Sequence, residues 1–184
     1  MDSYLHQLTA VILTYKTNLD ILKNCLKSIN SKVKILIVEN SSHFKYLKEI
    51  QSNFSNIEVI CSGSNLGYGG GNNFGLNKVK TNYALILNPD TICEDNFFSN
   101  VNKYLSGNID FTLIGTTYRN KTDFKPAGFF NKKDLKNAQF DKESNLYEVD
   151  WIAGHTILFN LKKFSNKIFF DENFFYFLKN LICA

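Results

Sequence analysis

The sequence of 184 residues lacks the features that mark several specialised classes of protein. Its four cysteines form no CxxC pair, whereas metal sites and disulfide frameworks usually group their cysteines more closely. We therefore expect free, buried thiols in a reducing compartment. The apolar run LTAVIL near the N-terminus is too short to span a membrane and has no basic leader. We predict a cytoplasmic protein.

Strong charge and repetition are missing as well. The formal net charge is only +4, and no basic stripe or nucleic-acid-binding motif is present, so we expect no nucleic-acid partner. No internal repeat, low-complexity tract or Pro/Gly/Ser linker divides the chain. Residues 1–184 are therefore predicted to form one domain, which is long enough to bury a core.

Short apolar segments alternate with amphipathic ones through the first half of the chain. The apolar segments predict buried strands at 8–14, 33–39, 57–61, 83–87 and 111–115. The amphipathic segments predict helices that begin after an N-cap at Asn18 and near residues 44, 72 and 94. The first helix should bury Ile21, Leu22, Cys25, Leu26 and Ile29. This alternation indicates an α/β fold with a mainly parallel sheet flanked by helices.

In such sheets, ligands bind beyond the carboxyl ends of the strands. The sequence places polar residues there after each of the first four strands, and all of them should face one crevice. They are Tyr15 and Lys16, Glu39 and Asn40, the loop 62–73, and Asp90.

The stretch SNLGYGGGNNFG at 64–75 holds five of the ten glycines. It is predicted to form a loop whose backbone amides could bind phosphate ahead of a helix. The alternative is a tight loop that packs against the sheet. The stretch matches neither a P-loop nor G-x-G-x-x-G, because Asn72 occupies the position of the third glycine.

Asp90 ends an Asn-Pro-Asp turn that would project a hard oxygen ligand into the crevice. Mg²⁺ or Mn²⁺ is commonly bound by one or two carboxylates together with phosphate oxygens and water. The alternative is an Asx-type turn or an N-cap for the next helix. Glu39 has a similar pair of interpretations, as an acceptor for a base or ribose hydroxyl or as a helix cap.

The chain resembles the family 2 glycosyltransferases of the GT-A fold, a Rossmann-like nucleotide-diphospho-sugar transferase fold, and especially the bacterial rhamnosyltransferase-like branch. The matching stretches are AVILTYKTNLDILKNCLKSI, ILIVENSS, NLGYGGGNNFG, ALILNPDT, VDWIAGHTILF and IFFDENFFYF. The resemblance implies a nucleotide-diphosphate sugar donor, a divalent metal (Mg²⁺ or Mn²⁺) and transfer with inversion. It also implies a saccharide or lipid-linked saccharide acceptor in surface polysaccharide biosynthesis. The donor half would be 1–116 and a partial acceptor half 117–184.

The same resemblance implies roles for particular positions. Tyr15 would lie near the nucleobase, and Glu39 would replace the Asp that the family usually has there. Asp90 would hold the metal on the diphosphate. Asn65 and Asn73 fall on the nucleotide-sugar loop of the family, and the residues near donor sugar and acceptor would be Trp151, Gly154 and His155.

The chain departs from the family after the FFYF stretch. The family has a catalytic Glu-Asp pair there, but this chain has Lys179 and Asn180. The chain also ends short of the family's usual length, so we expect a C-terminally truncated fold. Asp171 and Glu172, which match the FDE segment before the catalytic pair, are candidate substitutes for the base. The alternative is a non-catalytic, donor-binding remnant.

Two other features of the sequence allow more than one interpretation, namely the segment after the first strand and the aromatic and basic residues of the last third. A nucleotidyltransferase is less favoured because TYKTN lacks the Gly-rich, basic loop expected after the first strand. Aromatic and basic residues gather at 129–133 and 164–177. They either contact the inner face of a membrane peripherally or form the core, and we favour the core.

Overall fold

The computed structural model describes residues 3–106, 109–120, 123–125, 128–129, 140–141, 146–147, 149 and 151–172. The predictions for Lys179, Asn180, Cys183 and the FFYF stretch lie outside these residues, as do those for residues 130–133.

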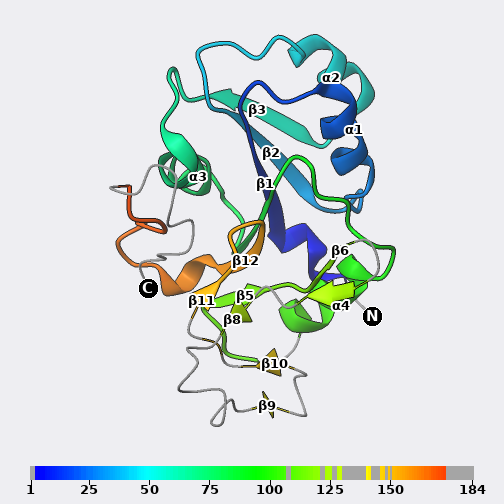
Figure 1. The fold of residues 1–184 in the computed structure, drawn as a ribbon, viewed down its shortest axis with the longest axis vertical. Coiled ribbons are helices and arrows are strands. Elements are labelled where there is room, and N and C mark those ends of the chain that lie inside the picture. Colours follow the sequence, from blue (N-terminus) through cyan, green and yellow to red (C-terminus); the bar gives the residue numbers. More distant parts are fainter. Residues whose placement is uncertain are drawn as a thin grey trace.

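A six-stranded sheet in the order β3-β2-β1-β4-β12-β5 forms the centre of the fold (Figure 1). Strands β1 to β4 are parallel, and β12 runs antiparallel between β4 and β5. The predicted α/β fold with a mainly parallel sheet is confirmed. The strands are β1 Leu8–Thr14, β2 Lys34–Glu39, β3 Ile57–Cys61, β4 Tyr83–Leu87, β5 Leu113–Gly115 and β12 Thr156–Asn160.

Shorter elements complete the described part of the chain. The described residues of the segment 117–147 include short strands. Three two-stranded ribbons are formed, β6–β7, β8–β11 and β9–β10. Their bounds are β6 Tyr118–Asn120, β7 Asp123–Lys125, β8 Gly128–Phe129, β9 Phe140–Asp141, β10 Leu146–Tyr147 and β11 Trp151–Ile152, with 3-10 helices at η1 Tyr4–Gln7 and η2 Leu161–Lys163.

Helices cover both faces of the sheet, as Figure 1 shows. Because successive strand residues point to opposite faces, Ala10 and Ile12 pack toward α1 (Leu19–Lys27), α2 (Leu47–Asn53) and α4 (Phe97–Ser106). Val11 and Val38 face the opposite side, with α3 (Gly67–Leu76) and a group of phenylalanines. The continuously apolar strands are thus explained by burial on both faces.

The N-cap predicted at Asn18 is confirmed. Its Oδ1 accepts hydrogen bonds from the backbone N–H groups of Asp20, at 2.8 Å, and Ile21, at 3.3 Å. Leu22, Cys25, Leu26 and Ile29 of the predicted face are buried, but the prediction for Ile21 is wrong, because its side chain is 47% exposed. At about 100° per residue, Ile21 lies at the edge of the stripe formed by the other four.

The glycine-rich segment forms a helix rather than the predicted loop. Helix α3 begins at Gly67, and the preceding loop covers only 62–66. A Cβ on Gly71 would lie 2.5 Å from Leu13 Cδ1, and one on Gly75 would lie 2.6 Å from Val38 Cγ2. Glycine has a low intrinsic helix propensity, but only a backbone without Cβ can approach the sheet this closely.

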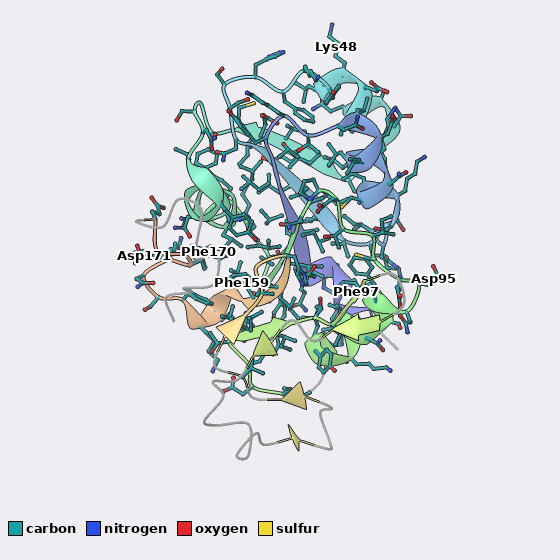
Figure 2. All side chains as sticks on the ribbon, viewed as in Figure 1. Lys48, Asp95, Phe97, Phe159, Phe170 and Asp171 are labelled. Atoms are coloured by element: carbon teal, nitrogen blue, oxygen red, sulfur yellow. The ribbon has the colours of Figure 1, made fainter. Side chains whose placement is uncertain are left out.

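The phenylalanines described after residue 155 belong to the core. The Phe159 ring centroid lies 5.8 Å from that of Phe164, 6.0 Å from that of Phe169 and 5.9 Å from that of Phe170. Figure 2 shows Phe159 and Phe170 on the side of the sheet that α3 covers. The core interpretation therefore holds for these residues. None of the helices in the described ranges is long and apolar enough to cross a bilayer.

The cysteine prediction is confirmed in part. Cys25 and Cys93 are free and buried, whereas Cys61 is free but exposed. Cys61 ends β3, the strand at the edge of the sheet. Its side chain therefore lacks a neighbouring strand on one side, and its burial was predicted wrongly.

We predict that Gly75→Ala lowers the free energy of unfolding by about 1–3 kcal/mol, because overpacking forces neighbouring side chains apart. Gly69→Ala is the matched control within the same helix. Its new Cβ would meet Phe170 Cβ at 3.3 Å and the Asp171 carbonyl oxygen at 3.4 Å, so small shifts can accommodate it. Urea unfolding of both variants measures the difference. A Gly75→Ala variant as stable as the parent would contradict the proposed close approach.

Candidate donor site at the carboxyl edge of the sheet

The carboxyl ends of β1, β2 and β4 meet at one edge of the sheet. Thr14 of β1 is in register with Glu39 of β2, and Ile12 of β1 with Leu87 of β4. The Asn40 N–H donates to the Thr14 carbonyl oxygen at 2.7 Å, which joins the first two strand ends. The residues that follow these strands therefore emerge side by side, as the sequence predicted.

Asp90 lies on a turn that is fixed on two sides. The Thr91 N–H donates to the Asn88 carbonyl oxygen at 3.0 Å and closes the turn, while the Asn88 N–H donates to the His155 carbonyl oxygen at 3.0 Å. On the other side, the Cys25 thiol donates to the Asn88 carbonyl oxygen over 3.7 Å. The turn is thus held between the loop before β12 and helix α1.

The carboxylate of Asp90 itself is exposed. It accepts no hydrogen bond from the residues that the structure describes, so it forms neither an Asx-type turn nor a helix cap within them. Helix α4 begins only at Phe97, too far along the chain for Asp90 to be its N-cap. A rigid turn with an uncommitted carboxylate is suited to binding a ligand.

Two buried thiols, those of Cys25 and Cys93, lie near this turn on the α1 side of the sheet. Burial, aided by the nearby Cys93 and Asp90, raises the pKa of Cys25 to about 12. Burial raises the pKa of Cys93 to about 11, although a hydrogen bond with Ser28 opposes the shift. Both groups therefore stay protonated at neutral pH, and the Cys25 thiol remains a donor to Asn88. The Ser28 hydroxyl oxygen accepts from the Cys93 N–H at 3.0 Å, which ties the chain beyond Asp90 to α1.

Glu39 is buried with 6% of its surface exposed, and hydrogen bonds fix its carboxylate. Oε2 accepts from the Thr14 hydroxyl at 2.8 Å, and Oε1 accepts from the Ser41 hydroxyl at 2.7 Å. A carboxylate keeps further lone pairs after two such bonds. The predicted contact of Glu39 with a base or ribose stays a prediction, and Tyr15, which is 43% exposed, lies on the neighbouring strand end.

Asn40 organises the loop before α3. Its Nδ2 donates to Asn65 Oδ1 and to the Gly67 carbonyl oxygen, both at 3.0 Å, and its Oδ1 accepts from the Leu66 N–H at 2.9 Å. Gly67 has a φ of +74°, a conformation that favours glycine. The sequence places Asn40 at the strand end, but this role could not be predicted from it, because only the fold brings residues 65–67 beside Asn40.

Asn73 holds the segment 169–172 against α3. Its Oδ1 accepts from the N–H groups of Phe169, at 3.2 Å, and Phe170, at 2.9 Å. Its Nδ2 donates to the Phe170 carbonyl oxygen at 2.9 Å and to Glu172 Oε1 at 2.8 Å. The amide is 4% exposed and is already committed to this segment. The predicted contact of Asn73 with a donor stays a prediction.

Tyr68 links α3 to the loop that precedes β12. Its hydroxyl donates to the carbonyl oxygen of Gly154, and burial raises its pKa, so the hydroxyl keeps its proton. This contact of Tyr68 could not be predicted from the sequence, because the surrounding glycines give the segment no apolar pattern with a helical period. The His155 carbonyl oxygen is bonded to the Asp90 turn through the Asn88 N–H, and the place of Gly154 and His155 on the sugar side stays a prediction. Trp151 lies in β11, paired with Phe129.

The described residues fit a divalent metal only if a ligand completes its shell. They include no group of three or more His, Cys, Asp or Glu side chains that could hold a metal ion. Because Glu39 is buried and hydrogen-bonded, Asp90 would supply the carboxylate, and phosphate oxygens and water would supply the rest, which is a usual arrangement for Mg²⁺. This fit is the basis on which a metal is considered below.

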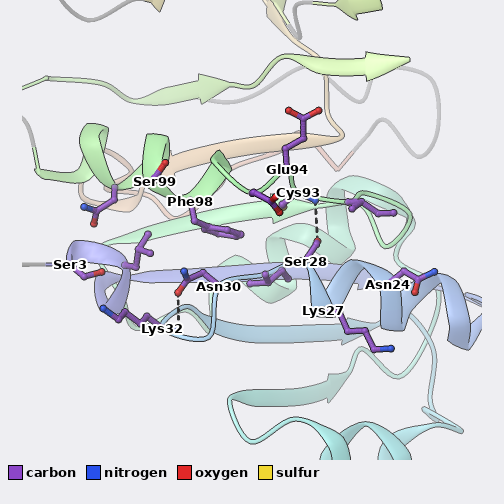
Figure 3. Close-up of a pocket in the computed structure, with 15 residues that line it drawn as sticks. Ser3, Asn24, Lys27, Ser28, Asn30, Lys32, Cys93, Glu94, Phe98 and Ser99 are labelled. Carbon is purple, nitrogen blue, oxygen red and sulfur yellow. Dashed lines mark hydrogen bonds between the residues drawn. The ribbon is translucent and has the colours of Figure 1, made fainter. Parts of the chain in front are cut away.

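A pocket of about 800 Å³ lies away from this edge (Figure 3). It is lined by the chain before β1, by the turn from α1 to β2 and by the start of α4, including Leu5, Ser28, Asn30 and Phe98, and by residues 92–95, which follow the Asp90 turn. These residues belong to the amino-terminal side of the sheet. Because strand-end residues converge at the opposite edge, we place the candidate site there and not in the pocket.

Comparison with known proteins agrees with this geometry. The chain matches the family described as glycosyl transferase family 2 over residues 9–177. A relative from Haloferax volcanii, named low-salt glycan biosynthesis hexosyltransferase Agl10, is 29% identical over 192 aligned positions. The alignment covers 98% of this chain but only 61% of that protein.

Solved structures share the fold at low sequence identity. The mannosyltransferase PcManGT from Pyrobaculum calidifontis, in complex with GDP-Man and Mn²⁺, superposes with a TM-score of 0.59 at 13% identity, covering 85% of this chain and 45% of that one. GalNAc-T7 with UDP, GalNAc and Mn²⁺ gives a TM-score of 0.61 at 14% identity, covering 91% and 38%. The family match over most of the sequence, supported by this shared fold, shows that the chain belongs to glycosyl transferase family 2.

Proposed function

We propose that the chain binds a nucleotide-diphosphate sugar at the carboxyl edge of its sheet and transfers the sugar to a saccharide or lipid-linked saccharide. The single observation that carries the proposal is Asp90, an exposed, uncommitted carboxylate on a turn that α1 and the loop before β12 hold in place. Family membership and the names of the relatives support the same chemistry. We further propose a hexosyl or rhamnosyl-type transfer with inversion, in surface polysaccharide biosynthesis.

The proposal divides the chain into two functional parts. Residues 1–116 would bind the donor, with Tyr15 and Glu39 at the nucleobase end and Asp90 at the diphosphate. Residues 117–184 would contribute part of the acceptor side. This chain spans about 61% of the Haloferax relative. We place the protein in the cytoplasm, at the inner face of the membrane if the acceptor is lipid-linked.

The described residues suggest how such a transfer would be prepared. A divalent metal, Mg²⁺ or Mn²⁺, would neutralise charge on the departing diphosphate when bound. Asp90 would orient that diphosphate, because its turn cannot move without breaking the bonds of Asn88 to His155 and Cys25. Gly154 and His155 border the turn and would line the sugar side.

An inverting transfer also needs a base for the acceptor hydroxyl. Glu172 is exposed, but its Oε1 accepts a hydrogen bond from Asn73, which orients the carboxylate. Asp171 is half-buried in the same segment (Figure 2). We propose these two carboxylates as candidates, since Lys179 and Asn180 cannot act as bases in the place of the family's Glu-Asp pair.

The second candidate function is a donor-binding protein without transfer activity. Lys179 and Asn180 favour it, because a protonated ammonium and a carboxamide cannot accept the acceptor proton. Both functions share the donor site and differ only in the base, so binding and transfer must be measured separately.

We predict that Asp90→Ala weakens Mn²⁺-dependent binding of UDP or GDP at least about tenfold, a loss of about 1.4 kcal/mol. The physical reason is the loss of the carboxylate that fixes the metal. Asp95→Ala is the matched control, because Asp95 is exposed on the same segment but lines the pocket of Figure 3. Isothermal titration calorimetry measures both. An unchanged affinity in Asp90→Ala, or no binding by the parent chain with Mn²⁺ present, would refute the proposed donor site.

We predict that any transfer or donor hydrolysis by this chain is lost in Asp171→Asn or Glu172→Gln. A general base typically contributes a factor of about 10²–10⁴ to the rate. Nucleoside diphosphate release from a labelled donor is the measurement, and unchanged calorimetric donor affinity shows that binding survives. If the parent chain binds donor but produces no turnover above background, the non-catalytic function is the correct one.

A further inference from the structure

Lys16 adopts a strained backbone conformation at the edge where the donor is proposed to bind. It follows β1 by two residues and has a φ of +53°. A side chain with a Cβ is disfavoured in this left-handed region. Such strain persists only where the surrounding structure imposes it, and it is concentrated at functional sites.

The register of the sheet puts Lys16 and Asp90 just beyond the carboxyl ends of adjacent strands, β1 and β4. Ile12 of β1 pairs with Leu87 of β4. Lys16 comes four residues after Ile12, and Asp90 comes three residues after Leu87. Neighbouring strands are about 4.8 Å apart, and a lysine ammonium extends from its backbone on a flexible four-carbon stem. Lys16 and Asp90 therefore lie in the turns that follow two adjacent strand ends.

Lys16 is also the one cation available at these strand ends. Among the described residues 15–17, 40–42, 62–64 and 88–90, which follow β1 to β4, no other Lys or Arg occurs. Its side chain is exposed, and its Nζ lies 5.3 Å from the centroid of the Tyr15 ring. It pairs with no carboxylate among the residues that the structure describes. The positive charge is therefore free to meet an anion.

We propose that Lys16 binds the diphosphate of the nucleotide-sugar donor, opposite Asp90. The inference rests on the proposed function. A diphosphate diester carries about two negative charges, which a divalent metal offsets, and Asp90 then adds a negative charge back to the site. Lys16 supplies the compensating positive charge from the next strand, while Tyr15 holds its ammonium in place by a cation–π contact.

Strain by itself does not identify a binding residue in this chain. Lys167 has a nearly identical φ of +55°, and it lies in an exposed turn where the Ile168 N–H donates to Asn166 Oδ1 at 3.2 Å. Among the described residues, Lys167 forms no hydrogen bond or ion pair with the residues that follow β1 to β4. Lys167 therefore provides a matched control that has the same residue type and backbone conformation without the site.

The test replaces each lysine by asparagine, which tolerates positive φ better than lysine does. We expect Lys16→Asn to raise the midpoint of thermal unfolding and to weaken Mn²⁺-dependent binding of UDP or GDP about tenfold. Lys167→Asn should raise the midpoint and leave binding unchanged. Lys16→Arg should retain most of the affinity, because it keeps the charge. If Lys16 only stabilised the fold, Lys16→Asn could not raise the midpoint of unfolding and weaken nucleotide binding at the same time.

Ligands with and without phosphate groups distinguish a charge interaction of Lys16 with the diphosphate from a contact with the nucleobase. The nucleoside and the nucleoside diphosphate of whichever base binds, uracil or guanine, are compared. The parent and Lys16→Asn should bind the nucleoside with nearly equal affinity, and their affinities should differ most for the diphosphate. If Lys16→Asn binds the diphosphate as tightly as the parent, or loses stability and affinity together, the inference is overturned while the donor site at Asp90 stands. If the parent chain binds neither UDP nor GDP with Mn²⁺, both proposals are overturned.

Discussion

The contact between α3 and the β1–β2 part of the sheet is the constraint on which the candidate site depends. Gly71 and Gly75 leave no side chain between the helix and Leu13, Val11 or Val38, so the two backbones approach closely. This approach brings the start of α3 to the carboxyl edge of the sheet, where Asn40 hydrogen-bonds the Gly67 carbonyl oxygen. A helix with ordinary side chains at these positions would stand farther away, and the loop before it would lose its anchor.

The other faces of the same helix hold parts of the chain that come much later in sequence. Tyr68 donates to Gly154, and Asn73 binds the backbone of Phe169 and Phe170. Helix α3 therefore connects the proposed donor side to the proposed acceptor side. The Asp90 turn joins this arrangement through the hydrogen bond from Asn88 to His155. Substitutions in α3 should thus influence residues on both sides of the crevice.

The strands and the carboxyl edge could be predicted because their signals are local. Continuous apolar runs predicted β1 to β4, and the rule for parallel sheets placed Tyr15, Glu39 and Asp90 together. The helix of residues 67–76 could not be predicted in the same way. Its glycines reduce helix propensity, and the reason for them is a contact with strands that are distant in sequence. The burial of Ile21 was predicted wrongly, because sequence alone does not define how wide the buried face of a helix is.

The sequence by itself determined the α/β class, the places of β1 to β5 along the chain, the family resemblance and the position of Asp90 at a strand end. Those properties depend on local periodicity and on motifs that are contiguous in the chain. Only the tertiary structure decided that the Asp90 carboxylate is exposed and that Asn73 is committed to residues 169–172. It also decided that Lys16 follows the strand adjacent to the one before Asp90 and has a positive φ. These properties depend on distances between residues far apart in the sequence, which packing and backbone strain fix only in the folded chain.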